Sequence, residues 1–129
     1  MKNLDQIRAT NALAAATNST FEGANDGEVV KKIPAMIRQN GILGALAFAH
    51  ENDGKAGHAD VFRAIIRHLK ELKRIPTTIA DSGPLDSFLS HLCAADAAVL
   101  RSATDETMAY LNYLRRFAKK GNTHDSDRD

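Results

Sequence analysis

Positive charges at helical spacing are the first side chains in this sequence that could do chemistry. Between positions 63 and 74 they stand at i, i+4, i+7 and i+11, which places them on one side of a helix. Cations along such a face can neutralise successive phosphates without reading bases, which makes binding salt-dependent. The same spacing is typical of the solvated face of an amphipathic helix, but such a face normally mixes both signs and acids are scarce here. This basic stripe consists of Arg63, Arg67, Lys70 and Arg74.

Two further basic clusters lie outside the stripe. Lys119 and Lys120 have a structural reason to exist, because cations stabilise the carboxyl end of a helix. The chain has two Tyr and five Phe to stack bases, and it contains no RNP pattern, KH loop or zinc finger. Any binding of nucleic acid by the chain alone is therefore expected to be weak and without sequence specificity. The two clusters are Lys31, Lys32 and Arg38, and Arg115, Arg116, Lys119 and Lys120.

Other residue groups resemble catalytic or metal sites, but their spacing argues against both. His50, Asp53, His58 and Asp60 flank one loop without an HExxH or ExxH pattern, which favours a solvated loop over a metal site. Cys93 follows His91 by two residues, so the two side chains point to different faces of a helix, and we expect a small buried thiol.

Three more groupings also lack the arrangement that chemistry needs. The segment around Asn40 and Gly41 is neither GxGxxG nor a Walker loop, and the His124, Asp125 and Ser126 triplet lies in a segment that cannot hold a triad rigid. The adjacent Asp105 and Glu106 diverge on a helix and are expected to be surface charges. We therefore expect no enzyme, no metal and no cofactor.

Composition limits the class of protein. The chain has 129 residues and a net charge of +1, with 43% hydrophobic and 26% charged residues, as in one folded domain without a global electrostatic field. One cysteine excludes an intramolecular disulfide and favours a reducing compartment. The longest nearly apolar run, over 41–49, has nine residues, and a membrane span needs roughly 20. We expect a cytoplasmic protein that does not contact membranes.

Residue counts and spacing predict a single-domain, all-α bundle of five to six helices. The 21 Ala and 12 Leu against four Val, eight Ile and no Trp favour helix over strand. Residues 1–121 form the predicted bundle, and 122–129 a disordered polar tail. Pro34 is expected to kink the second helix, Asn40 and Gly41 to end it, and Gly121 to end the last. The predicted helices cover 3–17, 26–40, 42–50 (deep in the core), 58–74, a segment marked by Leu85, Phe88, Leu89 and Leu92, and 96–120.

Two segments resemble a known family. The run from Lys32 to Phe48, KIPAMIRQNGILGALAF, is similar to the KxPxxIxxNGLxxxLAF segment of the small all-helical subunit of type III-B (Cmr) CRISPR effector complexes. The stretch from Leu100 to Ala118 resembles that family's YRxATxEALxYLxWLKRFA ending. Tyr113 stands where Trp is common, and Leu100 where an aromatic residue is common. Both departures keep an apolar character, so they bear on local packing more than on membership.

The resemblance implies a non-catalytic subunit in antiviral defence that stacks in more than one copy beside the guide and target RNA. Its implied partners are other Cmr subunits, copies of itself and both RNA backbones. At matching positions the resemblance implies contacts with the RNA backbone by Arg38, Arg101, Arg115 and Arg116. The spacing of the basic stripe alone adds Arg67, Lys70 and Arg74. Lys119 completes the set of candidate RNA-binding residues. Fold-shaping roles are implied for Ile33, Pro34, Asn40, Gly41 and Phe48. The alternative is a helical protein-interaction adaptor that does not bind RNA.

Overall fold

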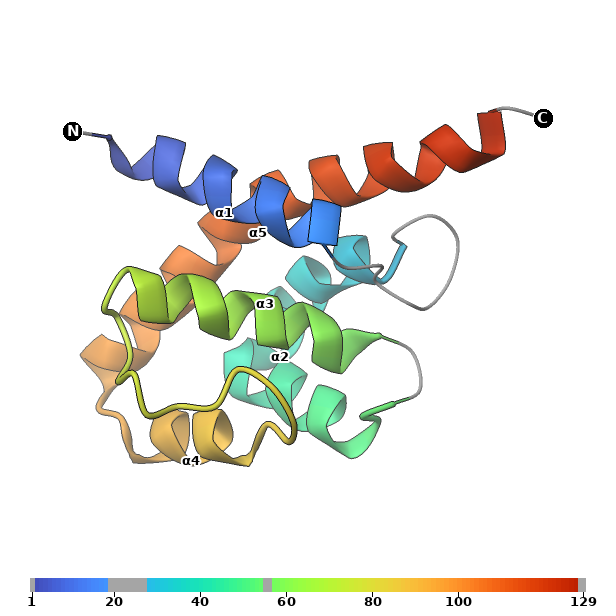
Figure 1. Cartoon of the computed structure of the whole chain (residues 1–129). Coiled ribbons are helices and arrows are strands. Elements are labelled where there is room, and N and C mark those ends of the chain that lie inside the picture. The colour runs from blue at the N-terminus through green and yellow to red at the C-terminus, as the bar shows by residue number, and fades with distance from the viewer. Residues whose placement is uncertain (1, 19–27, 55–56, 128–129) are drawn as a thin grey trace.

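The protein is a bundle of five α-helices, which confirms the all-α prediction (Figure 1). The computed structural model describes residues 2–18, 28–54 and 57–127, with side chains up to residue 118 except that of Asn18. Asp26, at which the second helix is predicted to begin, lies outside these residues. The helices are α1 (Leu4–Asn18), α2 (Glu28–Glu51), α3 (His58–Glu71), α4 (Asp86–Ala94) and α5 (Ala97–Asp127).

The long helix α5 is the centre of the arrangement. It packs against α1, α2 and α3, while α4 packs on α2 (Figure 1). Its inward face repeats at helical spacing, and its start is capped by Asp96, whose Oδ1 accepts a hydrogen bond from the Val99 backbone N–H at 2.9 Å. Spacing of three and four residues predicts its inward positions from Leu100 onward. Leu100 is only partly buried, and the other five are buried: Ala103, Thr107, Leu111, Leu114 and Ala118.

Helix α3 supplies the other half of the core. Its apolar residues follow the predicted i, i+1, i+4 pattern, and all those within the helix are buried: Val61, Phe62, Ile65, Ile66 and Leu69. In α1 the buried position is Ala12, whereas Ala14, near the predicted inward face, is exposed. In α4, Phe88 and Leu92 are buried as predicted, and Leu85 is buried just before the helix begins.

The break in α2 lies at Gly41, as the predicted stop signal requires, and not at Pro34. Gly41 has φ 78° and ψ 164°, a region that only glycine adopts without strain, and it separates two helical halves. The expected kink at Pro34 is wrong, because the proline keeps helical dihedral angles, with which its fixed φ is compatible.

The second half of α2 is only half buried, which corrects the prediction that it lies deep in the core. Ile42, Ala45, Leu46 and Ala49 are buried, but Ala47 is exposed and Phe48 is 43% exposed. The Phe48 ring meets the His58 ring edge to face, with 5.1 Å between centroids.

Two helix ends differ from the predictions. Helix α3 ends at Glu71, because Lys73 adopts φ 60° and the backbone N–H groups of Lys73 and Arg74 donate to the carbonyls of Lys70 and Leu69 at 3.0 and 2.9 Å. Arg74 therefore follows the helix instead of lying on it. Helix α5 continues through Gly121 to Asp127, so the predicted end at Gly121 is wrong. The proposed disorder of the tail stays a prediction, since those side chains lie outside the described residues.

Candidate nucleic-acid interface

The packing of α2 against α5 brings two predicted RNA-binding residues together. Arg38 and Arg115 line one groove of about 520 Å³ although 77 positions separate them in the sequence, and Lys31 lines it too. The other lining residues are Pro34, Met108, Ala109 and Asn112, so among the described side chains no carboxylate lines this groove. We call it the α2–α5 groove.

The cations of the α2–α5 groove are weakly engaged by the rest of the protein. Arg38 is exposed and makes no hydrogen bond or ion pair with any described residue. The Nη2 of Arg115 lies 3.4 Å from Asn112 Oδ1, which is long for a hydrogen bond, and the Nζ of Lys31 lies 3.7 Å from Glu28 Oε1. These cations can therefore accept an anionic partner without first breaking strong internal ion pairs.

Arg74 and Arg101 line a second depression, but side chains of both charges surround it. Its volume is about 410 Å³, and Arg8, Asp105 and Glu106 also line it. Arg74 donates from Nη1 to the Ser102 Oγ at 3.2 Å, and its Nη2 lies 3.9 Å from Glu106 Oε1. Two carboxylates thus offset much of the positive charge, so this depression attracts anions less than the α2–α5 groove does.

The basic stripe of α3 finds acidic partners from other segments. Arg63 donates to Asp53 at 2.7 Å and to Asp60 at 2.9 Å. Burial lowers the pKa of Arg63, but these carboxylates outweigh it, and the net direction is upward. Asp81 engages two further cations of the stripe, since its carboxylate accepts from Lys70 Nζ at 3.1 Å and its backbone carbonyl accepts from Arg67 at 3.3 Å. Acids are scarce along the sequence of the stripe, but the fold therefore brings carboxylates from other segments next to its cations.

Of the remaining candidate residues, Arg116 is the one whose side chain the structure describes outside both depressions and the α3 stripe. It is exposed. The side chain of Lys119 lies outside the described residues, as do Lys120 and the His124, Asp125 and Ser126 triplet. The RNA-binding role of the whole candidate set stays a prediction, but the structure separates its members by their access to an anion.

A buried polar cluster at the junction of α1, α3 and α5 escaped the sequence analysis. Glu106 is 2% exposed, which corrects its interpretation as a surface charge. Its Oε2 lies 2.8 Å from both the Nε of Arg8 and the Nε2 of His68, and its Oε1 lies 2.8 Å from a second Arg8 nitrogen. The signal was its spacing: Glu106 lies between the inward positions Ala103 and Tyr110, three and four residues away.

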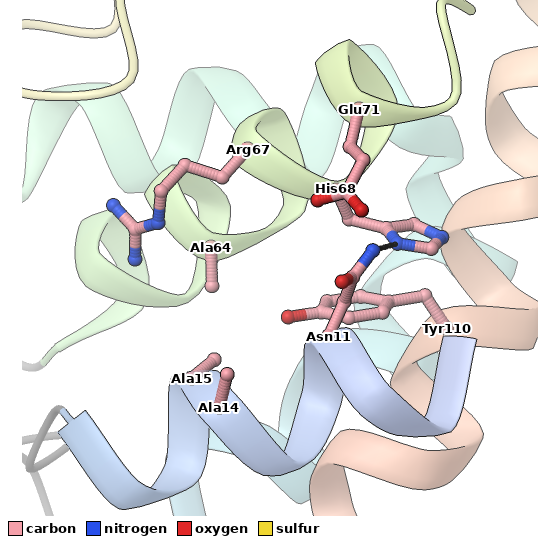
Figure 2. A pocket seen from close by; sticks show the side chains of 8 residues that line it. All are labelled: Asn11, Ala14, Ala15, Ala64, Arg67, His68, Glu71 and Tyr110. Atoms are coloured by element: carbon pink, nitrogen blue, oxygen red, sulfur yellow. Dashed lines mark hydrogen bonds between the residues drawn. The ribbon is translucent and has the colours of Figure 1, made fainter. Parts of the chain in front are cut away.

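The hydrogen bonds of this cluster fix the proton on one nitrogen of His68. The Asn11 amide nitrogen can only donate, and it lies 2.9 Å from His68 Nδ1, so Nδ1 accepts (Figure 2). His68 therefore carries its proton on Nε2 and donates it to Glu106. Burial lowers the pKa of His68 and keeps the ring neutral. Burial raises the pKa of Glu106, but the bonds from Arg8 and His68 outweigh this and hold it below its usual value.

The residues of the rejected metal and thiol sites have other surroundings. No group of three or more His, Cys, Asp or Glu side chains among the described residues could hold a metal ion. His50 lies 3.5 Å from Asp86 on α4, whereas Asp53 of the loop and Asp60 of α3 bind Arg63. Cys93 is exposed, which contradicts the predicted buried thiol, because the nine-residue α4 buries only Phe88 and Leu92.

The chain has a match among known protein families. Among the described residues, no helix combines the length and the apolar character that crossing a membrane requires. A family model described as CRISPR-associated protein (Cas_Cmr5) matches residues 4–120, which covers both motif segments and all five helices up to Lys120. No curated protein and no solved structure gives a significant match.

Proposed function

We propose a structural role on RNA for this chain, which belongs to the CRISPR-associated Cmr5 family and is a subunit of a Cmr effector complex. In this proposal the protein is non-catalytic and cytoplasmic, stacks in several copies along the complex, and contacts the backbone of guide or target RNA without base specificity. Its contribution is to hold target RNA on the complex in antiviral defence.

The α2–α5 groove is the observation that supports this proposal best. Arg38 comes from the first motif segment and Arg115 from the second, and both line one groove in which no described residue contributes a carboxylate. Guanidinium groups bind phosphate oxygens in a bidentate geometry and stay charged at all physiological pH values. The groove thus presents its positive charge where a phosphodiester backbone can pass.

The physical signature of such binding is its dependence on salt. Each phosphate that a cation neutralises releases condensed counterions, and for single strands the slope of log K against log salt changes by about 0.7 per contact. Removing Arg38 and Arg115 is therefore expected to weaken RNA binding for all sequences alike and to flatten the slope by one to two units.

Reconstitution of the guide-loaded Cmr complex tests the proposal. Complexes carry the wild-type chain, Arg38→Ala with Arg115→Ala, or the control pair Lys2→Ala with Lys73→Asn, which removes the same charge from exposed positions outside the groove. Target RNA retention is measured across a salt series. We expect the groove variant to enter the complex and to lose retention most at low salt, while the control behaves as wild type.

Two results would count against this role. Unchanged retention by the groove variant would remove the α2–α5 groove from the RNA interface. Unchanged retention by a complex that lacks the chain altogether would favour the protein-interaction adaptor, in which the basic faces meet acidic surfaces of neighbouring subunits.

A further inference from the structure

A pocket between α1, α3 and α5 lies apart from the α2–α5 groove, so phosphate binding in that groove does not involve it. Its volume is about 440 Å³, within the range of about 300–1,000 Å³ that small-molecule sites occupy. The methyl groups of three alanines form one part of its lining, and five polar side chains form the rest (Figure 2). The lining residues are Asn11, Ala14, Ala15, Ala64, Arg67, His68, Glu71 and Tyr110.

The Tyr110 hydroxyl points into this pocket (Figure 2). Tyr110 is 1% exposed and stacks on the His68 ring, with 4.3 Å between centroids and 14° between planes. Its hydroxyl makes no hydrogen bond with any described residue, and Figure 2 shows it directed into the space between Ala64 and the alanines of α1. A pocket-facing hydroxyl that no protein group engages is free to donate a hydrogen bond to a ligand in the pocket.

Asn11 supplies a second polar atom beside this hydroxyl. Its amide nitrogen is used by His68 Nδ1, so the amide oxygen remains an acceptor, and Figure 2 shows it turned to the same side as the hydroxyl. Burial raises the pKa of the Tyr110 hydroxyl, which therefore keeps its proton and can donate it. The pocket thus offers one acceptor next to one donor.

The charge of the pocket favours a neutral, flat ligand. Arg67 and Glu71 both line it, so the two charges offset each other and a phosphate gains little there. Figure 2 shows the Arg67 guanidinium across the pocket from the Tyr110 hydroxyl, and guanidinium planes stack on unpaired bases in RNA-binding proteins. We propose that this pocket, the Tyr110 pocket, holds one unstacked nucleobase of an RNA strand, an inference that rests on the proposed RNA-binding function.

The chemistry of the pair explains why such a site tolerates any sequence. Each of the four RNA bases carries, on its Watson–Crick edge, an N–H donor beside an acceptor. The Asn11 oxygen accepts from that N–H while the Tyr110 hydroxyl donates to the neighbouring acceptor. A subunit of an RNA-guided complex must accept whatever sequence base pairing selects, and this pair meets that requirement.

Alanine methyl NMR tests the proposal on the full-length protein. Spectra of methyl-labelled chain are recorded with a short single-stranded oligoribonucleotide and with an abasic oligonucleotide of the same length and charge. We expect the Ala14, Ala15 and Ala64 methyl signals to shift with the first ligand and not with the second. Equal shifts with both would overturn the proposal, because the phosphates alone would then cause them, and so would the absence of any shift.

Two variants locate the effect at the pocket. Tyr110→Phe removes the hydroxyl and keeps the ring on His68, and we expect base-dependent binding to weaken roughly three- to tenfold, as for one hydrogen bond. Tyr113→Phe makes the same change outside the pocket and is the control. Ala14→Phe fills the pocket from an exposed position and is expected to abolish the base-dependent shifts. Retained base-dependent shifts in Ala14→Phe would contradict the assignment.

The same experiments separate this inference from the proposed function. If Arg38→Ala with Arg115→Ala loses RNA retention while the abasic and intact ligands shift the methyl signals equally, the backbone role stands and the base pocket fails. If retention is unchanged but the shifts remain base-dependent, the opposite holds. In the assembled complex, crosslinking from 4-thiouridine placed in the guide or in the target identifies which strand supplies the base.

Discussion

Glu106 Oε2 lies 2.8 Å from His68 Nε2, and both side chains are buried in the centre of the bundle. The carboxylate is ionised there because Arg8 reaches it from α1 with two further bonds of 2.8 Å. One acid thus connects three helices that are far apart in the sequence. A buried charge of this kind is tolerated only while each of its partners is present.

Removing the arginine is therefore expected to be costly. Arg8→Met keeps an unbranched apolar stem but leaves Glu106 without its cation, and we expect the free energy of unfolding to fall by about 3 kcal/mol. Urea denaturation measures the change. Arg116→Met, at an exposed position that lines neither depression, is the control and is expected to stay within about 0.5 kcal/mol of wild type. Equal effects of the two variants would mean that the cluster does not stabilise the fold.

His68 predicts a loss of stability in mildly acidic solution. Its pKa is lowered in the folded protein, chiefly by burial, so below about pH 6.5 the unfolded chain binds a proton that the folded chain resists. Stability is then complete above that pH and falls, by up to about 1.4 kcal/mol per pH unit, as the pH decreases toward the folded pKa.

Urea midpoints between pH 7.5 and 5 check this pH dependence. His68→Gln removes the titrating ring and keeps a donor toward Glu106, so its curve is expected to be flatter. Some slope remains, because burial also lowers the pKa of His58. Identical slopes for variant and wild type would show that His68 is not the source. Glu106 acts only at lower pH, since its own pKa lies below the usual range.

Arg63 separates stability from RNA binding. It donates to Asp53, to Asp60 and to the Gly83 carbonyl at 2.7–2.9 Å, so it ties α3 to two loops. Arg63→Ala is expected to lower the free energy of unfolding by about 1–3 kcal/mol and to leave target RNA retention by the Cmr complex unchanged. Arg38→Ala is the matched comparison and is expected to show the reverse. Loss of RNA with Arg63→Ala at full stability would return the basic stripe to the interface.

Lys73 occupies a position that suits glycine. Its φ of 60° is left-handed, and such a conformation costs an L-residue roughly 1 kcal/mol. Lys73→Gly is expected to raise the free energy of unfolding by about that amount. Lys73→Ala removes the same charge without relieving the backbone and is expected to give no such gain. Thermal denaturation of both variants gives the comparison, and a gain in both would assign the effect to charge.

The helices and their inward faces could be predicted from the sequence, because each depends on the spacing of neighbouring residues. The buried set of α3 from Val61 to Leu69 and that of α5 from Ala103 to Ala118 follow from the 3.6-residue period. Helix ends depend on backbone bonds instead. Lys73 ends α3 although its side chain gives no such signal, and Gly121 fails to end α5 although it is a typical stop residue.

The ion pairs between distant segments could not be predicted from the sequence, because they depend on which segments the fold brings together. Asp81 lies 11 positions from Lys70, and its side chain returns to the α3 stripe through the loop after that helix. Glu106 meets Arg8 across 98 positions. The α2–α5 groove also arises from such a meeting, since only the packed helices bring Arg38 to Arg115.

Helix α1 docks on the bundle through polar bonds and through small, mostly half-buried apolar side chains. Ala12 is its only fully buried apolar side chain among the described residues, and Leu13 is 53% exposed. Detachment of α1 would break the bonds of Arg8 and Asn11 but would expose only one fully buried apolar side chain of α1 itself, Ala12. The amide protons of α1 should therefore exchange with solvent by a local opening, well before those of α3. Because α1 forms one wall of the Tyr110 pocket, any ligand in that pocket should slow this exchange. Ligand binding would thus lengthen the time that α1 stays docked on the bundle.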